Sequence, residues 1–252
     1  MNQRRLYAHR GASAERPENT MVAFERAVEI GVDALECDVH LTRDGHLIIA
    51  HDDTAQRMAA VRAPWSEMDL VEAQRLDVGW GFLTKDGTRP FAGKGICVPR
   101  FADVLDAFPD VRINVDIKKD HRAIDAMLAL CAAKHADGRV TIASFKTSIA
   151  VDVRRAGWSG ESALSQYEVA SLVALPSPAW RALPFTGTAA QIPVSQGPLR
   201  FDRQAFIAKC HALGLRVDFW TVDDHAEAAR LLALGADGIM TNDPAALRPL
   251  FT

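Results

Sequence analysis

The amino-acid sequence predicts an α/β fold, a (β/α)8 TIM barrel. Two observations lead to this prediction. Short apolar segments typical of buried parallel strands alternate with amphipathic helical patterns along the 252 residues. When one returning strand is set aside, eight such segments remain, which is the number that a closed barrel requires.

The predicted strands and helices follow one another in regular order, except between residues 165 and 187. The eight strands are 5–9, 33–39, 111–118, 139–145, 162–165, 187–193, 215–222 and 237–241. The helices are 20–31, 121–136, 146–156, 201–213 and 224–234. In the first helix, Met21, Phe24 and Val28 share one face, and Gly31 provides a C-terminal stop. An open doubly wound sheet is the alternative, but no glycine-rich phosphate-binding loop follows the first strand.

A ninth apolar segment, residues 46–51, is predicted to be the return of a hairpin. Only the six residues HLTRDG separate it from the second strand. A parallel crossover needs about a dozen residues or more. We therefore expect an antiparallel hairpin across 39–51, with Asp44 and Gly45 in its turn.

The hairpin brings three polar side chains together. Glu36 and Asp38 share one face of the second strand, because side chains alternate with a period of two. The position of the turn places residue 51 opposite residue 37 or 38. His51 is therefore expected beside both acids.

Residues 57–99 form a long segment, rich in glycine and proline towards its end, that precedes the next helix. A segment of this length without regular structure is usually functional or a small subdomain. We expect one domain over 1–252, with this segment inserted over the C-terminal mouth of the barrel. Its large apolar side chains, which are candidates for a lid, are Met58, Trp65, Met68, Trp80, Phe82 and Phe91.

Composition excludes several classes of protein. The formal net charge of −3 offers no basic surface for nucleic acid. No apolar run is long enough for stable membrane insertion, and the first residues lack the apolar stretch of a secretory signal, so we expect a cytoplasmic protein. The four cysteines form no CxxC pair and are predicted to be reduced thiols; they are Cys37, Cys97, Cys131 and Cys210. The sequence assigns no oligomeric state.

Polar residues collect at the carboxyl ends of the predicted strands, where TIM barrels place their active sites. These candidates are His9, Arg10, Glu36, Asp38, His51, Asp116, Lys118 and Trp220. Three carboxylates suit a hard divalent cation such as Mg²⁺ or Ca²⁺, two cationic side chains suit a phosphoryl group, and two histidines suit general acid–base catalysis. A salt bridge between Asp116 and Lys118 is the structural alternative for that pair, and Trp220 is as well explained by packing as by lining a pocket.

Several motifs resemble those of the glycerophosphodiester phosphodiesterase family. The stretch AHRGASAERPENTMVAFERAVEIGVDALECDVHLTRDGHLIIAHDD is similar to that family's opening signature, with its HRG, PENT, E-x-D, T-x-D-G and HD elements. NVDIK resembles its N-x-E-x-K strand, FWTVD its V-W-T-V-N strand, and GADGIMTNDP its G-x-D-G-I-x-T-D-x-P segment. The resemblance extends over most of the chain, with the motifs in order.

The resemblance implies metal-dependent hydrolysis of a glycerophosphodiester to glycerol 3-phosphate and an alcohol. The residues that it implies are His9 and His51 for acid–base catalysis, Glu36, Asp38 and Asp116 for the metal, and Arg10 and Lys118 for the phosphate. Which histidine is the acid and which the base stays open. So does the nucleophile, which is water or a glycerol hydroxyl of the substrate.

Two positions depart from the family pattern. Asp116 stands where the family usually has Glu, so the residue expected as the third metal ligand has a shorter side chain than usual. Asp223 stands where the family usually has Asn. Two other functions remain as alternatives. One is a lysophospholipase D-like reaction, which needs a mouth that admits an acyl chain, and the other is a catalytically silent protein that binds phosphorylated metabolites.

Overall fold

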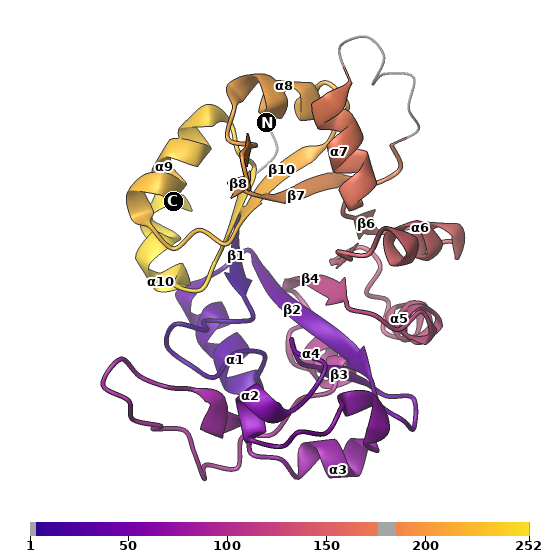
Figure 1. The fold of residues 1–252 in the computed structure, drawn as a ribbon, viewed down its shortest axis with the longest axis vertical. Coiled ribbons are helices and arrows are strands. Elements are labelled where there is room, and N and C mark those ends of the chain that lie inside the picture. Colours follow the sequence, from indigo (N-terminus) through magenta and orange to yellow (C-terminus); the bar gives the residue numbers. More distant parts are fainter. Residues whose placement is uncertain (1–3, 176–184, 252) are drawn as a thin grey trace.

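The computed structural model describes residues 4–175 and 185–251. Its main sheet contains a nearly closed barrel of eight parallel strands, in the order β6-β5-β4-β2-β1-β11-β10-β7 (Figure 1). These strands are β1 Arg5–His9, β2 Ala34–Leu41, β4 Arg112–Ile117, β5 Val140–Ala143, β6 Glu161–Ser162, β7 Ala189–Pro193, β10 Arg216–Trp220 and β11 Gly238–Thr241. Each predicted strand overlaps one of them, and the predicted fold class is confirmed.

The barrel closes between β6 and β7 through a short junction. Ala163 and Ala189 form an isolated parallel bridge. The Leu164 N–H donates to the Ala189 carbonyl oxygen at 2.8 Å, and the Thr188 N–H donates to that of Ser162 at 2.7 Å. These contacts complete the ring, so the sheet is not the open doubly wound alternative.

Helices cover the outside of the barrel. They are α1 Met21–Ile30, α4 Phe101–Ala107, α5 Arg122–Ala133, α6 Thr147–Arg155, α7 Gln166–Ala174, α8 Gln204–His211, α9 His225–Leu234 and α10 Pro244–Leu247, followed by the 3-10 turn η4 Arg248–Phe251. The boundaries of α1 follow from its caps, because the Thr20 side chain accepts from the Ala23 N–H and Gly31 adopts the left-handed conformation. Among the described residues, no helix is long and apolar enough to cross a bilayer.

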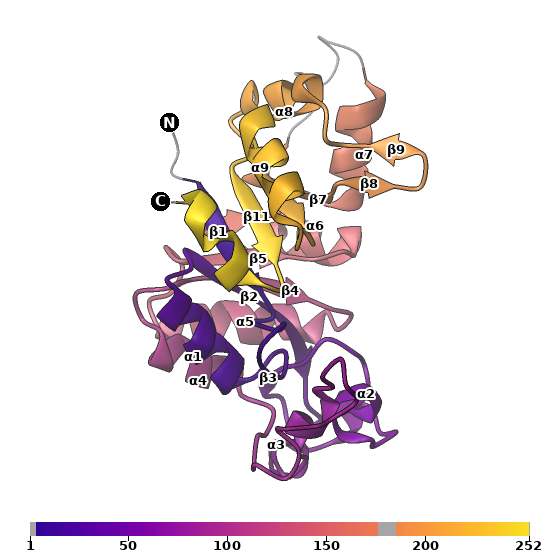
Figure 2. The same cartoon turned by 90° about the vertical axis from the view of Figure 1, so that its left-hand side faces the viewer.

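Two elements near the mouth were not predicted. Helix α7 begins at a capping box, in which Ser165 and Glu168 each accept from the other's backbone N–H. A small ribbon of β8 Ser195–Gln196 and β9 Leu199–Arg200 follows β7 (Figure 2). Both elements lie in parts of the chain that carry weak periodicity.

The predicted hairpin on β2 is confirmed. Strand β3, Leu47–Ile49, pairs antiparallel with β2, and Val39 lies opposite Ile49. Gly45 has φ +86° in the turn, a conformation that glycine adopts without steric cost. Extending the register by two residues places His51 opposite residue 37, within the predicted range.

Segment 57–99 packs beside this hairpin. It contains η1 Trp65–Glu67, α3 Leu70–Gln74 and η2 Val78–Gly81, and α2 Gln56–Ala59 begins just before it. Met58, Trp65 and Met68 are buried in one cluster with Ile48 of β3, so these three do not form a lid. The segment lies at the lower end of the molecule (Figures 1 and 2) and flanks the mouth, and none of its residues lines the main cavity there.

The barrel interior below the mouth is polar. Arg5 at the start of β1 donates to both carboxylate oxygens of Glu161 on β6, at 2.6 and 2.8 Å. Farther up, the Tyr7 hydroxyl donates to Asp218 at 3.1 Å, and Arg216 donates to the same carboxylate at 3.0 Å. Barrel interiors are more often filled by branched apolar side chains. Here hydrogen-bonded ion pairs occupy that place.

Candidate active site

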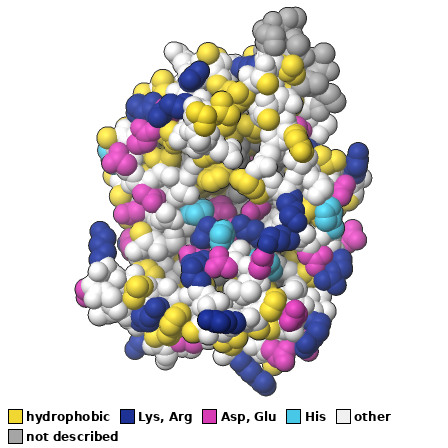
Figure 3. All heavy atoms as spheres, in the orientation of Figure 1, with side chains coloured by type: hydrophobic (Ala, Val, Ile, Leu, Met, Phe, Trp, Pro, Cys, Tyr) yellow, Lys and Arg dark blue, Asp and Glu magenta, His cyan; other side chains and the backbone are white. Residues whose placement is uncertain are grey.

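The carboxyl ends of the barrel strands surround a cavity of about 1570 Å³. In the space-filling view, charged and histidine side chains gather below a hollow, with hydrophobic side chains beside and above it (Figure 3). The cavity lining includes all eight residues that the sequence predicted for the site, which are His9, Arg10, Glu36, Asp38, His51, Asp116, Lys118 and Trp220. Strands β1, β2, β4 and β10 and the hairpin return bring them together.

His9 ends β1 and is held in one tautomer. Its Nδ1 lies 2.8 Å from Oδ1 of Asn242, the residue after β11. Because Asn242 Nδ2 donates to Asp223 at 2.8 Å, the amide oxygen must face His9 and accept its Nδ1–H. In the neutral ring Nε2 then carries the lone pair, and it lies 3.9 Å from Glu36 Oε2. Burial lowers the pKa of His9, and the charge of Arg10 lowers it further.

Arg10 is placed by a tight turn after β1. Its φ is +58°, unusual for a residue with a side chain, and Gly11 follows with φ +80°. A Cβ at Gly11 would lie 2.7 Å from the backbone of α1, so only glycine fits there. The turn directs the Arg10 N–H to Glu36 at 2.9 Å. The guanidinium contacts Glu18 at 3.0 Å and lies 3.3 Å from Asp38.

Glu36 and Asp38 are both buried on β2 but differ in their charge partners. Burial raises the pKa of Glu36 well above its usual range, and the Asp38 charge adds to this. Burial acts in the same direction on Asp38, but the charges of Lys118 and Arg10 outweigh it and lower the pKa of Asp38. Asp38 also accepts from the Asn19 amide at 2.9 Å. It is therefore a compensated anion, whereas the Glu36 carboxyl is not.

Lys118 bridges two aspartates across the β2–β4 pair. Its Nζ lies 2.6 Å from Asp38 Oδ1 and 2.7 Å from Asp116 Oδ2. The salt bridge considered as the structural alternative is thus present. The second oxygen, Asp116 Oδ1, is buried without a hydrogen-bond partner, and burial raises the pKa of Asp116.

The three carboxylates provide oxygen ligands of the kind that a hard divalent cation prefers. They are not grouped closely enough in this structure to coordinate one ion. Glu36, Asp38 and Asp116 line one cavity, and the unpartnered oxygen of Asp116 is a donor of the kind that Mg²⁺ and Ca²⁺ take. Within residues 4–175 and 185–251, no three acidic, histidine or cysteine side chains are grouped to hold an ion. The Lys118 ammonium lies between the two aspartates and neutralises part of their charge.

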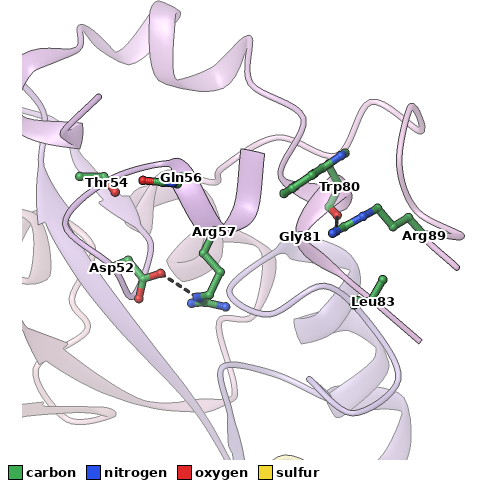
Figure 4. Close-up of a pocket in the computed structure, with 8 residues that line it drawn as sticks. All are labelled: Asp52, Thr54, Gln56, Arg57, Trp80, Gly81, Leu83 and Arg89. Carbon is green, nitrogen blue, oxygen red and sulfur yellow. Dashed lines mark hydrogen bonds and ion pairs between the residues drawn. The ribbon is translucent and has the colours of Figure 1, made fainter. Parts of the chain in front are cut away.

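A chain of charged side chains holds His51 and leads away from the cavity. The His51 Nδ1 lies 2.7 Å from Asp52 Oδ1. Asp52 accepts from Arg57 Nε at 2.6 Å, and the other Arg57 nitrogens donate to Glu18 at 2.7 and 2.8 Å. Figure 4 shows Arg57 on α2 reaching Asp52 at a second hollow of about 680 Å³. Because Glu18 also binds Arg10, this chain connects His51 to Arg10.

Trp220 serves both purposes that the sequence left open. It lines the cavity at the end of β10, where its ring lies 6.3 Å from that of Phe145 in an edge-to-face arrangement. It also packs against Tyr7, Ala34 and Met240, which lie inside the barrel.

Sequence reasoning left several polar residues of this site out of its candidates. They are Glu18, Asn19, Asp52, Arg57 and Asn242. Four had visible signals, since Glu18 and Asn19 stand in PENT, Asp52 stands in HD, and Asn242 directly follows a strand. Arg57 had none, because it reaches the site from a helix outside the barrel.

Comparisons with known proteins identify the family of this chain. Residues 9–246 match the family model described as the glycerophosphoryl diester phosphodiesterase family. A glycerophosphodiester phosphodiesterase of Caldanaerobacter subterraneus subsp. tengcongensis is 32% identical over 249 residues, covering 96% of this chain and 95% of that protein. Lysophospholipase D GDPD1 of Mus musculus is 28% identical over 272 aligned residues, covering 97% and 85%.

One solved structure is informative about the fold. It is an Oleispira antarctica phosphodiesterase in complex with the product sn-glycerol-3-phosphate. It has a TM-score of 0.74 and 21% identity, covering 97% of this chain and 95% of that one. The family match spans nearly the whole barrel, and the bacterial relative is similar from end to end. This chain belongs to the glycerophosphoryl diester phosphodiesterase family.

Proposed function

We propose that the mouth of this barrel hydrolyses glycerophosphodiesters to glycerol 3-phosphate and an alcohol, with a divalent cation. The observation that carries the proposal is the pair of histidines lining one cavity, each with Nδ1 held by an acceptor. The same cavity is also lined by the cationic side chains Arg10 and Lys118 and by the carboxylates of Glu36, Asp38 and Asp116. Phosphodiester cleavage requires such a set, because a proton must leave the nucleophile, another must reach the leaving oxygen, and charge builds on the phosphoryl oxygens.

The hydrogen-bond partners distinguish the two histidines. His9 Nδ1 faces a neutral amide oxygen, whereas His51 Nδ1 faces the Asp52 carboxylate. A carboxylate stabilises an imidazolium more than an amide does. We therefore assign His9 as the base, which takes a proton from the attacking hydroxyl at Nε2. His51 is the acid, which gives a proton from Nε2 to the leaving alkoxide.

Arg10 and Lys118 are assigned to the phosphate. Both line the cavity as charged donors. Ion pairs with neighbouring acids hold the Arg10 guanidinium and the Lys118 ammonium in place when no substrate is bound. In the transition state they would stabilise the charge that develops on the non-bridging oxygens. Trp220 would border the bound substrate on the opposite, apolar side of the cavity.

Glu36, Asp38 and Asp116 would hold the cation. Burial raises the pKa of Glu36 and that of Asp116 because it disfavours their charged forms. A bound cation would stabilise these charged forms. When bound, Mg²⁺ or Ca²⁺ would stabilise negative charge on the phosphoryl oxygens. The short side chain of Asp116 favours Ca²⁺, which accepts irregular geometry more readily than Mg²⁺ does.

The substrate is a small molecule, and we place the reaction in the cytoplasm. All four cysteines are free, and three of them are buried, which agrees with a reducing compartment. A lysophospholipase D reaction is the alternative, since it cleaves the same bond in a substrate that carries a hydrocarbon chain. The name of the mouse relative supports keeping it.

Release of glycerol 3-phosphate tests the proposed function. We expect purified protein to release it from glycerophosphocholine, glycerophosphoethanolamine or glycerophosphoglycerol in the presence of Mg²⁺ or Ca²⁺, and to stop when EDTA is added. Activity that survives EDTA would remove the cation from the proposal. Binding of glycerol 3-phosphate without turnover of any substrate would instead identify a silent binding protein.

A further inference from the structure

We propose that Arg57, which lies on α2 outside the barrel, is a positioning residue for two groups of the active site. Through Asp52 it orients the acid His51, and through Glu18 it orients the phosphate ligand Arg10. The inference rests on the proposed function and goes beyond it, because it gives a role in the reaction to a side chain that does not line the main cavity.

The guanidinium of Arg57 binds two carboxylates with its three nitrogens. Nε donates to Asp52 Oδ2 at 2.6 Å. Nη1 and Nη2 donate to the two oxygens of Glu18, at 2.8 and 2.7 Å. A guanidinium that donates twice to one carboxylate fixes its direction as well as its distance. Arg57 therefore determines how both carboxylates are oriented.

His51 depends on such a restraint more than His9 does. The side chain of His51 is 35% exposed, whereas that of His9 is 18% exposed, so burial does less to fix the ring of His51. Because Asp52 Oδ2 is bound to Arg57, Oδ1 stays 2.7 Å from His51 Nδ1. Burial acts to raise the pKa of Asp52, but the hydrogen bonds from Arg57 and His51 outweigh it and lower that pKa. The ring thus keeps a charged acceptor at Nδ1 and has Nε2 available for proton transfer.

Glu18 extends the same restraint to Arg10. Its Oε1 accepts from Arg57 at 2.7 Å and from Arg10 Nη1 at 3.0 Å, so one carboxylate oxygen joins two guanidinium groups. Burial acts to raise the pKa of Glu18, but the hydrogen bond from Arg57 and the charge of Arg10 outweigh it and lower that pKa. Arg10, Glu18, Arg57 and Asp52 therefore form a row of alternating charge, and the row ends at His51.

The inserted segment 57–99 fixes the place of Arg57. Met58, the next residue, is buried in the cluster that this segment forms beside β3. A Cβ at Gly81 of η2 would lie 2.7 Å from Met58, so η2 packs closely on α2. The Arg57 side chain leaves this apolar base and reaches Asp52 at the second hollow (Figure 4). The segment thus serves the reaction by supporting a positioning residue.

Two substrates that differ in their leaving group test the effect on His51. When glycerophosphocholine is cleaved, the electron pair of the P–O bond stays on an alkoxide oxygen, which takes the proton from His51 Nε2. When the 4-nitrophenyl ester of glycerol 3-phosphate is cleaved, the leaving 4-nitrophenolate is stable without a proton. The ratio of kcat/KM for the choline ester to that for the nitrophenyl ester therefore reports the acid. Changes in phosphate binding or in the amount of folded protein cancel in this ratio.

Single variants separate the two roles. Asp52→Asn should lower the ratio by about 10-fold, the usual effect of removing an outer partner of an active-site group, with KM for the nitrophenyl ester within about twofold of wild type. Glu18→Gln should raise KM for both substrates by about threefold or more, because Arg10 loses an ion pair, and should keep the ratio within about twofold. Arg57→Gln should show both effects.

Arg100→Gln is the matched control. Arg100 is 44% exposed, close to the 45% of Arg57, and it pairs with Asp103 of α4 and does not line the main cavity. A wild-type ratio in Arg57→Gln, or an equal loss in the control, would overturn the role of Arg57. So would additive losses of the ratio in Asp52→Asn/Arg57→Gln, because Arg57 is proposed to act on His51 only through Asp52.

Failure of the proposed function would give a different result. If wild type turns over neither substrate, the proposed function and the role of His51 as an acid are both wrong. If wild type turns over both and Arg57→Gln keeps the wild-type ratio, only the role of Arg57 is wrong. Nitrogen-15 NMR of the neutral His51 ring is the second readout. Its proton should lie on Nδ1 in wild type and be divided between both nitrogens in Arg57→Gln, and an unchanged tautomer would overturn the inference.

Discussion

Two glutamates at opposite ends of the barrel show how one residue type serves two purposes. At the amino-terminal ends of the strands, Glu161 accepts both guanidinium hydrogen bonds of Arg5, and these lower its pKa to about 2 although burial opposes the shift. At the mouth, Glu36 accepts from one backbone N–H, and burial raises its pKa well above the usual range. The paired carboxylate contributes to stability, whereas the under-compensated one is available to a ligand.

Two aspartates differ in their hydrogen-bond partners in a similar way, although burial raises the pKa of both. Asp218, deep in the barrel, has Tyr7 and Arg216 as partners. Asp116 at the mouth keeps one oxygen buried without a partner. A buried polar atom without a partner destabilises a fold, so its presence points to a function that requires it. Variants at the two ends should therefore separate activity from stability.

The largest expected effect is on turnover at the mouth. His9→Ala and His51→Ala should each lower kcat for glycerophosphodiester hydrolysis by about 10²-fold or more, from the usual contribution of general acid–base catalysis. Thermal unfolding should stay near that of wild type, and steady-state kinetics provides the measurement. His46→Ala is the control, because His46 is half exposed at the hairpin turn. Near-normal turnover in either variant would remove its assigned role.

The next effect concerns the under-compensated acids. Asp116→Asn should lose most metal affinity and most activity while the protein still folds. Asp116→Glu should keep measurable activity, because it retains a carboxylate ligand and restores the residue usual in the family. Metal titration by calorimetry, run beside turnover, compares the three proteins. Metal binding like that of wild type in Asp116→Asn would reduce Asp116 to a partner of Lys118.

A smaller effect is expected at Asn242 and Asp223, which together position the ring of His9. Asn242→Ala should lower kcat by about 10-fold with KM changed less than twofold, because His9 loses the acceptor that fixes its tautomer. An unchanged kcat in Asn242→Ala would show that Asn242 does not act through His9.

The smallest expected effect on catalysis is at the pair of Arg5 and Glu161, far from the mouth of the barrel. Glu161→Gln should leave kcat and KM unchanged and lower the free energy of unfolding by about 1 kcal/mol, a small value because the pair is partly exposed. The folded-state pKa of about 2 lies below the usual glutamate pKa of 4.5, so this stabilisation is present above pH 4.5 and is lost as the pH falls towards 2. Urea unfolding between pH 3 and 7 measures it. A change in kcat would contradict the separation of the two ends.

The strands were predictable because nearly every one is buried on both faces and reads as a short apolar run between turn signals. The hairpin register followed from the Asp44–Gly45 turn and the period of two, and it placed His51 correctly to within one residue. Helix α7 was missed although Ser165 and Glu168 form a capping box, because its few buried residues give weak periodicity. The ribbon β8–β9 was missed because each of its strands has only two residues, too few to show an alternating pattern.

The candidate site was predictable as a set of residues but not as a network. Strand ends identify which side chains reach the mouth, and all eight candidates line one cavity. Sequence order does not show that Lys118 bridges two aspartates or that Arg57 supports His51 through Asp52. Such contacts depend on side-chain conformation and on segments that meet only in three dimensions.

Because β1 lies between β2 and β11, the first strand of the barrel has both neighbours only after β11 has been synthesised. Every one of the eight candidate residues has been translated by Trp220, and the hairpin brings His51 beside Glu36 and Asp38 early, since those residues are close in sequence. His9 acquires its partner Asn242 only when β11 pairs with β1. A nascent chain therefore carries all eight candidate side chains before the contact between His9 and Asn242 can form. The arrangement described at the mouth requires β11 to have paired with β1.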